Sequence, residues 1–170
     1  MSSDTIRFYS TGDEYGEFSN FAPYPITLEG KRWPTTEHFF QAQKFDDSAY
    51  RERIRRANSP AIAARLGRSR KVRIRRSWES TKIAVMRRAV DAKFRQHESL
   101  RELLLSTGTA TLVEHTVHDS FWGDGGNGRG RNQLGRILME VRDSLGPNER
   151  TKPKLRRSST NRGREPKHRA

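Results

Sequence analysis

The sequence contains no cysteine. This absence excludes disulfides, Cys-ligated zinc, iron–sulfur clusters and thiol catalysis. Long apolar runs are also missing. The N-terminus is polar and has no apolar run long enough for a signal-peptide core, and no later apolar run is long enough to span a membrane. The sequence therefore indicates an intracellular protein, and we expect a cytoplasmic location.

Acidic residues are few relative to basic ones. The 170 residues include 34 Lys or Arg and 20 Asp or Glu, which gives a net charge of +14. Half of this excess lies in residues 147–170, where nine Lys or Arg face two Glu. This segment has almost no large apolar side chains, so we expect one domain over residues 5–146 and then a disordered basic tail. The tail is interpreted either as a nucleic-acid arm or as a solvated extension that contacts polyanions at most.

The apolar pattern predicts a mainly helical α+β domain with a small N-terminal β-sheet. Short β-prone segments lie at residues 6–9 and on both sides of Glu29-Gly30, a pair typical of hairpin turns. Helices are predicted from their caps and from apolar residues at helical spacing. The predicted helices begin near Thr35, Ser59, Ser77, Leu100 and Asn132, and a further strand is predicted at residues 112–113.

The first segment with candidate chemistry is residues 33–44. On a helix, Glu37, Gln41 and Lys44 share one face, because they are spaced i, i+4 and i+7. An acid, an amide and a cation so aligned could hold a sugar phosphate, and Trp33 at the helix entrance could stack on a base. The alternative is structural, since a Glu in the first helical turn is favoured by the helix dipole alone.

The second segment is residues 118–135, which contain five glycines before the last predicted helix. Backbone N–H groups at a helix start bind phosphate well, and Arg129 and Arg131 would assist them. The segment fits neither the P-loop pattern nor the dinucleotide-binding fingerprint. A mobile surface loop is the alternative. The crowding of an acid and two aromatics into residues 119–122 argues against it.

Metal and serine chemistry have weak support. His38, His115, His118 and Asp119 are the candidate ligands, but no two-His-plus-carboxylate set falls on one predicted helix. No nucleophile-elbow motif accompanies any serine. We therefore expect neither a metal nor another cofactor.

A further basic stretch spans residues 65–76, with seven Lys or Arg and no acid. Alternation over residues 71–75 indicates an exposed strand. Phosphate contact and a simple solvated edge both remain open for it.

Taken together, these motifs resemble the YbiA-like, or NADAR (NAD- and ADP-ribose-associated), domain family over nearly all of residues 6–145. The resemblance is carried by ordered motifs at matching spacing. These are Phe8-Tyr9, Glu17–Phe21, Trp33–Phe45, Trp78 with Met86, Asp119–Gly123 and Asn132–Arg142. The resemblance implies a YbiA-like fold and an N-glycosidase, a hydrolase of the bond between a base-like nitrogen and C1 of ribose.

The family resemblance also implies substrates and site residues. The first substrate class is phosphorylated ribosylamino-pyrimidine intermediates of riboflavin biosynthesis, with release of ribose 5-phosphate. The alternative is ADP-ribosyl-guanine in modified nucleic acid, and a non-catalytic ADP-ribose binding module is a third possibility. Glu37 and Asp119 match the family acids, and Lys44 matches the family lysine. The full predicted binding set is Asn20, Trp33, Gln41, Lys44, Trp122, Gly123, Arg129 and Asn132.

The expected chemistry needs two carboxyl groups and no metal. Cleavage of an N-glycosidic bond builds positive charge on the sugar ring, which a carboxylate can stabilise while it activates water. We assign Asp119 to the water and Glu37 to acid–base assistance or the ribose hydroxyls, roles that are exchangeable. Trp33 and Trp122 would sandwich the base. The two acids must then lie within about 10 Å of each other.

Overall fold

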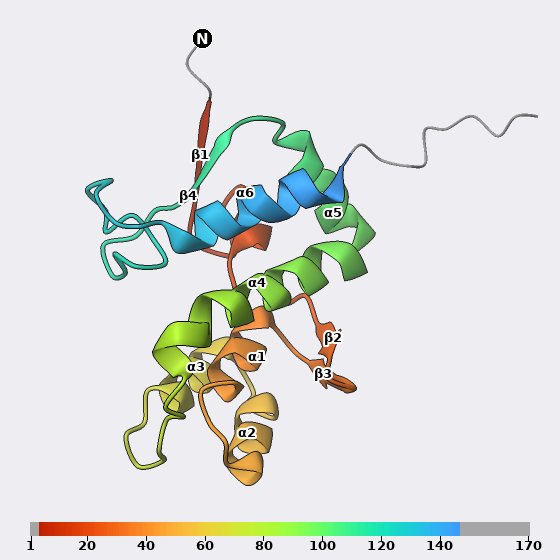
Figure 1. Ribbon diagram of the computed structural model, residues 1–170. Coiled ribbons are helices and arrows are strands. Elements are labelled where there is room, and N and C mark those ends of the chain that lie inside the picture. Colours follow the sequence, from red (N-terminus) through yellow and green to blue (C-terminus); the bar gives the residue numbers. More distant parts are fainter. Residues whose placement is uncertain (1–3, 147–170) are drawn as a thin grey trace, which may run out of the picture.

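Helix α4 (Trp78–Gln96) runs through the middle of the molecule, as Figure 1 shows for the computed structural model, which describes residues 4–146. On one side of it lie α5 (Glu98–Ser106), α6 (Gln133–Leu145) and the paired strands β1 (Thr5–Phe8) and β4 (Thr111–Glu114). On the other side lie α1 (Thr36–Ala42), α2 (Ser48–Arg55), α3 (Pro60–Gly67) and the hairpin of β2 (Ile26–Leu28) and β3 (Lys31–Trp33). The predicted mainly helical α+β architecture is confirmed.

The strands form two separate two-stranded sheets and not one N-terminal sheet. β1 pairs in parallel with β4, in a register that places Thr5 opposite Thr111 and Phe8 opposite Glu114. β2 and β3 pair antiparallel across Glu29 and Gly30, whose φ angles are +55° and +71°. Two successive positive φ values suit the tight turn that the sequence predicted there. The parallel pair carries the N-terminal segment to the second half of the chain, which the sequence pattern did not indicate.

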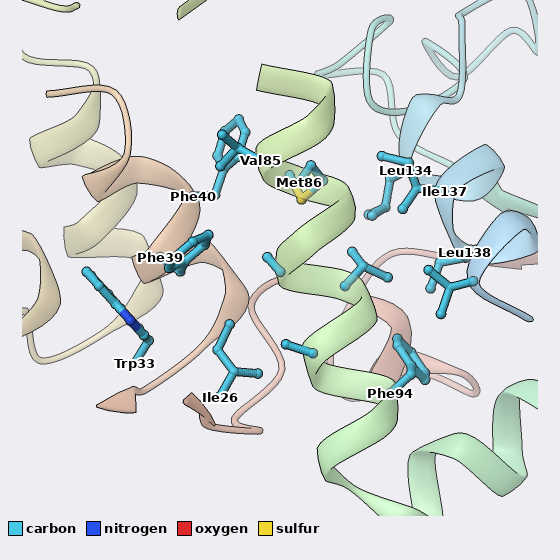
Figure 2. Close-up of a cluster of buried hydrophobic side chains, with 14 of the residues drawn as sticks. Ile26, Trp33, Phe39, Phe40, Val85, Met86, Phe94, Leu134, Ile137 and Leu138 are labelled. Carbon is cyan, nitrogen blue, oxygen red and sulfur yellow. The ribbon is translucent and has the colours of Figure 1, made fainter. Parts of the chain in front are cut away.

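The core surrounds α4 on both sides (Figure 2). Val85 and Met86 of α4 lie between Phe40 of α1 and Leu134 of α6 in this view. The helical spacing predicted for α4 and α6 is confirmed, because every apolar residue that it placed on the inner face is buried. These residues are Trp78, Val85, Met86, Ala89, Phe94, Leu134, Ile137, Leu138, Val141 and Leu145.

Side-chain caps fix where the helices on the α1 side begin. Thr35 accepts a hydrogen bond from the His38 N–H at the start of α1, and Ser59 accepts one from the Ile62 N–H at the start of α3. Each such cap satisfies a backbone donor that a helix start leaves without an intrahelical partner. The sequence predicted both helices from these caps.

Two local predictions differ from the structure. Helix α2 was missed, although Asp47 caps it and Tyr50 and Ile54 bury one face. Its eight residues are otherwise mostly charged or polar, so the apolar period is too short to stand out. The strand predicted at residues 71–75 is reduced to a single bridge between Ile74 and Phe45.

No helix within residues 4–146 has the length and apolar character needed to cross a membrane. The predictions made for the basic tail concern residues 147–170 and lie outside the described residues.

Candidate active site

A cavity of about 680 Å³ lies where the two sides of the molecule meet over α4. Its walls come from α1, α3, the turn after β1, residues 19–21 and the segment from Glu114 to Trp122, while Met86 of α4 contributes from the central helix. The volume is within the range of small-molecule sites, about 300–1,000 Å³. Six of the ten predicted site residues line it, namely Asn20, Glu37, Gln41, Lys44, Asp119 and Trp122.

The first wall is the α1 face that the sequence predicted. Glu37 and Gln41 are both only 7% exposed, and Lys44 follows directly after the helix. The Gln41 Nε2 donates a hydrogen bond to Glu37 Oε1 at 2.6 Å. Gln41 Oε1 is buried and has no hydrogen-bond partner among residues 4–146. The glutamine therefore holds one Glu37 oxygen in place and leaves the other for a ligand.

Burial dominates the electrostatics of this wall. Burial raises the pKa of Glu37, the Gln41 hydrogen bond and the charges of Lys44 and Arg68 oppose the rise, and the charge of Asp119 adds to it. Burial also lowers the pKa of Lys44, and Glu37 counters that effect. The two predicted acids are therefore close enough to influence each other's charge, and two cations accompany them.

The second wall is the segment after β4, in which Asp119 acts as a local cap. Its Oδ1 accepts hydrogen bonds from the N–H groups of Phe121 and Trp122, both at 2.8 Å. Its Oδ2 accepts no hydrogen bond from any described residue. One oxygen thus orients the carboxylate and the other remains available to a water or a sugar.

Asp124 organises the glycine-rich segment behind Asp119. Its Oδ1 accepts hydrogen bonds from the N–H groups of Thr116 at 3.1 Å and Gly126 at 2.8 Å, and its Oδ2 lies 2.7 Å from His115 Nδ1. Burial opposes ionisation of Asp124, but these partners outweigh it and lower the pKa of the carboxyl. The segment is a hydrogen-bonded loop with a charged centre, so the interpretation as a mobile surface loop does not fit it.

Glu114 is a third cavity acid that the sequence interpretation missed. It ends β4, and its backbone N–H donates to Asn132 Oδ1 at 3.0 Å. Burial raises its pKa to about 7, and the charges of Asp119, Glu37 and Asp124 add to the rise. The available signal was its place directly after the predicted strand at residues 112–113.

The segment before α1 is anchored by a buried lysine. Lys93 of α4 is only 1% exposed, and its Nζ donates hydrogen bonds to the carbonyl oxygens of Glu17 at 2.5 Å and Ser19 at 2.9 Å. The next carbonyl, that of Asn20, accepts the Glu37 N–H at 3.2 Å. These contacts place Asn20 at the cavity edge, with Lys93 as a support that the sequence did not reveal.

Four predicted site residues do not line the cavity, and three of them have a structural role. Trp33 is 2% exposed, packs edge-on against Phe39 in the core and donates from Nε1 to the Leu28 carbonyl, so it is not at hand to stack on a base (Figure 2). Gly123 is buried where a Cβ would lie 2.9 Å from the Glu114 carbonyl oxygen.

The other two belong to the far end of the loop. The Asn132 side chain donates to the Leu112 carbonyl at 2.9 Å and accepts from the Glu114 N–H, so it extends the pairing of β4. Arg129 is exposed outside the cavity. The loop amides expected to bind phosphate are largely occupied, since the N–H groups of residues 130–134 donate to carbonyls of residues 120–124. The cavity cations are instead Lys44 and Arg68.

Two exposed aromatic residues line the cavity and were not predicted as site residues. Tyr9 is 48% exposed and Phe21 is 40% exposed. Large apolar side chains left in solvent beside a pocket are typical of ligand contact. Both lie in motifs that the resemblance included, which was the signal for them.

The histidines and acids of residues 4–146 do not gather into a metal site. His38 is buried, with Nδ1 2.8 Å from Thr35 Oγ1 and Nε2 2.9 Å from the Ala57 carbonyl oxygen. Within residues 4–146 no group of three His, Asp or Glu side chains is arranged to hold a metal ion.

Comparison with known proteins places the chain in a family. Residues 7–146 match the NADAR domain. The chain is 59% identical over 145 residues to N-glycosidase YbiA of Escherichia coli, covering 85% of this chain and 91% of that protein. It is 46% identical over 144 residues to an N-glycosidase of Nostoc punctiforme, covering 83% of this chain and 92% of the relative.

Two further comparisons support the same family. A riboflavin biosynthesis protein of Vibrio vulnificus is 47% identical over 140 residues, which cover 82% of this chain and 38% of that protein. The NMR structure of E. coli YbiA superposes with a TM-score of 0.79 at 59% identity and covers 85% of this chain and 86% of the other. The prediction of an enzyme is confirmed, and the chain belongs to the NADAR domain family as an N-glycosidase.

Proposed function

We propose that this N-glycosidase hydrolyses phosphorylated ribosylamino-pyrimidines of riboflavin biosynthesis and releases ribose 5-phosphate. The observation that carries the proposal is the shared cavity of Glu37 and Asp119 with two cations, Lys44 and Arg68. The acids suit a ribosyl carbon that becomes cationic, and the cations suit its phosphate. The name of the Vibrio vulnificus relative, a riboflavin biosynthesis protein, supports the same pathway.

The positions of the carboxyl oxygens support separate roles for the two acids. Asp119 offers Oδ2, because Oδ1 is already held by two backbone N–H groups. We assign this oxygen to the attacking water, whose proton it takes as the C–N bond breaks. Gln41 holds Glu37 through Oε1. The Glu37 carboxylate would stabilise the positive charge on the ribosyl ring or accept hydrogen bonds from the ribose hydroxyls.

The base side of the cavity differs from the predicted tryptophan sandwich. Trp122 lines the cavity, whereas Trp33 belongs to the core. Tyr9 and Phe21 expose their rings at the same cavity and take the place of Trp33 in our proposal. Aromatic faces accept any planar base, so the rings would provide affinity and leave selectivity to polar groups.

The test is hydrolysis of a ribosylamino-pyrimidine 5′-phosphate by the purified full chain, followed as release of ribose 5-phosphate. We expect turnover by the wild type, and we expect Glu37→Gln and Asp119→Asn each to lower kcat by about 100- to 10,000-fold, because each removes a group that acts on the transition state. Circular dichroism and thermal melts would verify that the variants fold.

Glu102→Gln is the matched control, because Glu102 is exposed on α5, away from this cavity. It should retain wild-type kcat. Full activity of a folded Glu37→Gln or Asp119→Asn protein would contradict the assignment of that acid, and absence of turnover by the wild type would contradict the substrate class.

The second candidate substrate is ADP-ribosyl-guanine in nucleic acid. One observation favours it, namely that Arg68 of the cavity continues into an exposed basic stretch, of which Arg70, Lys71, Arg73 and Arg76 are all exposed. Such a stretch could follow a phosphate backbone. Hydrolysis of ADP-ribosylated oligonucleotide should then fall steeply with salt and should weaken when residues 147–170 are deleted. A ribosyl phosphate substrate should be nearly indifferent to the deletion.

A further inference from the structure

The cavity holds three acids, and their hydrogen-bond partners divide them. Glu37 receives a hydrogen bond from Gln41, and Asp119 receives two from backbone N–H groups. The carboxyl group of Glu114 has no hydrogen-bond partner among residues 4–146. Among residues 4–146 it is the one cavity acid whose carboxyl group receives no hydrogen bond that would stabilise the anionic form.

The charges around Glu114 point the same way. The charge of Glu37 acts on it from α1, and the charges of Asp119 and Asp124 act on it from the loop that follows β4. Burial raises the pKa of Glu114 to about 7, and these three negative charges add to the rise. The cavity cations Lys44 and Arg68 act on Glu37 instead. Burial and these charges together favour the neutral form of the Glu114 carboxyl.

We propose that Glu114 is the acid that protonates the leaving nitrogen of the N-glycosidic substrate. The proposal rests on the proposed function and adds a third catalytic residue to it. A ribosylamino nitrogen is a poor leaving group as an anion, so its departure requires a proton from a nearby donor. A neutral carboxyl that lines the cavity and has no other partner is suited to supply it.

The step balances with water alone. The Glu114 carboxyl gives its proton to the nitrogen as the C1–N bond breaks and its electron pair passes to that nitrogen. Water adds to C1 and gives a proton to the Asp119 carboxylate. The products are the free amine and the ribose phosphate. The proton on Asp119 then passes to Glu114, directly or through exchange of one proton each with solvent, which restores the starting charges.

The structure supports Glu114 at this position through its backbone. Asn132 accepts the Glu114 N–H at 3.0 Å and donates to Leu112 at 2.9 Å, and the Glu114 carbonyl accepts the Asp124 N–H at 2.9 Å. None of these contacts involves the carboxyl group. A Glu114→Gln substitution therefore changes the acid and leaves its supports intact.

The decisive experiment compares two leaving groups. One substrate is the ribosylamino-pyrimidine 5′-phosphate, and the other is 4-nitrophenyl ribofuranoside 5-phosphate, whose phenolate leaves without a proton. We expect Glu114→Gln to lower kcat on the first by at least about 100-fold and on the second by no more than about threefold. Glu37→Gln and Asp119→Asn should lower both, and Glu102→Gln should lower neither.

A pH profile and a conservative variant complete the test. Wild-type kcat on the amino substrate should fall as the pH rises above about 7, since Glu114 then loses its proton. This limb should disappear in Glu114→Gln. In Glu114→Asp it should persist at a reduced rate, which also covers the case that the glutamine variant does not fold.

Each contrary outcome has a distinct meaning. Equal losses on both substrates, or no loss on either, would overturn the role of Glu114 and leave the N-glycosidase assignment intact. A wild-type protein that cleaves the nitrophenyl substrate but not the amino substrate would overturn the proposed substrate class. A wild type inactive on both would overturn the proposed function and this proposal with it.

Discussion

Glu37 and Asp119 face one cavity from walls that are built differently. The Glu37 wall is helical, and its side chains are placed by helical periodicity, burial and contact with α3. The Asp119 wall is a loop, and its side chains are placed by hydrogen bonds to backbone groups, with Asp124 at the centre. A helix presents a site through packing, whereas a loop needs polar groups that fix its own backbone. The two walls should therefore fail in different ways.

Loss of the loop centre should have the largest effect. Asp124→Ala leaves the buried N–H group of Thr116 and the partly buried N–H group of Gly126 without their acceptor, at a cost of about 1–3 kcal/mol for a buried donor. The resulting displacement of Asp119 should lower kcat by about 100-fold, as a shift of about 1 Å can. Urea unfolding and steady-state kinetics would measure both effects. Unchanged kcat in a destabilised protein would show that Asp124 does not position Asp119 for the reaction.

The activity should be sensitive to added side-chain volume beside the helical wall, because packing and not hydrogen bonding to backbone groups places its side chains. A Cβ at Gly67 would lie 2.0 Å from Gln41 Oε1, so Gly67→Ala should push the amide away from Glu37. Loss of a hydrogen bond to a charged acceptor, about 1.5 kcal/mol, should lower kcat about tenfold. Gly12→Ala is the control, because nothing lies within 4 Å of its added Cβ. Equal kinetics for the two variants would refute the coupling of α3 to Glu37.

The exposed aromatic residues Tyr9 and Phe21 belong to neither wall, and they should affect substrate binding more than the chemical step. Phe21→Ala removes a ring that is 40% exposed at the cavity, and a stacking contribution of about 1 kcal/mol predicts a KM about fivefold higher with little change in kcat. Ile74→Ala serves as the comparison, since Ile74 is 41% exposed but outside the cavity. A fall in kcat alone would indicate that Phe21 positions the acids and does not hold the base.

Acid should weaken the loop wall by a smaller amount. Although burial opposes ionisation of Asp124, its partners lower its pKa below the ordinary 3.8. A depressed pKa in the folded state adds stability above about pH 4 that disappears as the pH falls through the folded value. The free-energy difference between wild type and Asp124→Asn should therefore shrink from pH 6 to pH 3. A difference that stays constant in urea titrations would exclude this linkage.

The same contrast explains what the sequence could predict. The spacing of Glu37, Gln41 and Lys44 reveals a helical face, because helical period is written directly into sequence distance. Trp33 failed as a site residue because its position at the helix entrance does not say which way the ring turns. The structure turns it into the core against Phe39.

The loop wall is less accessible to such reasoning. Asp119 was found through its motif, but the acceptor role of Asp124 depends on which N–H groups the folded loop turns toward it. Glu114 was missed for a similar reason. Its proximity to Glu37 arises only when β4 pairs with β1 and closes the cavity, a contact between distant segments that no local pattern specifies.

The parallel pairing of β1 with β4 also sets an order of assembly. Thr5 meets Thr111 only after most of the domain has been synthesised, whereas α1 and α3 can pack as soon as both have left the ribosome. Contacts between distant segments close late, because the intervening chain must first lose its freedom. Glu37 is therefore synthesised and can be placed on α1 before the chain that contains Glu114 and Asp119. A nascent chain that ends before residue 111 contains Glu37 but neither Glu114 nor Asp119.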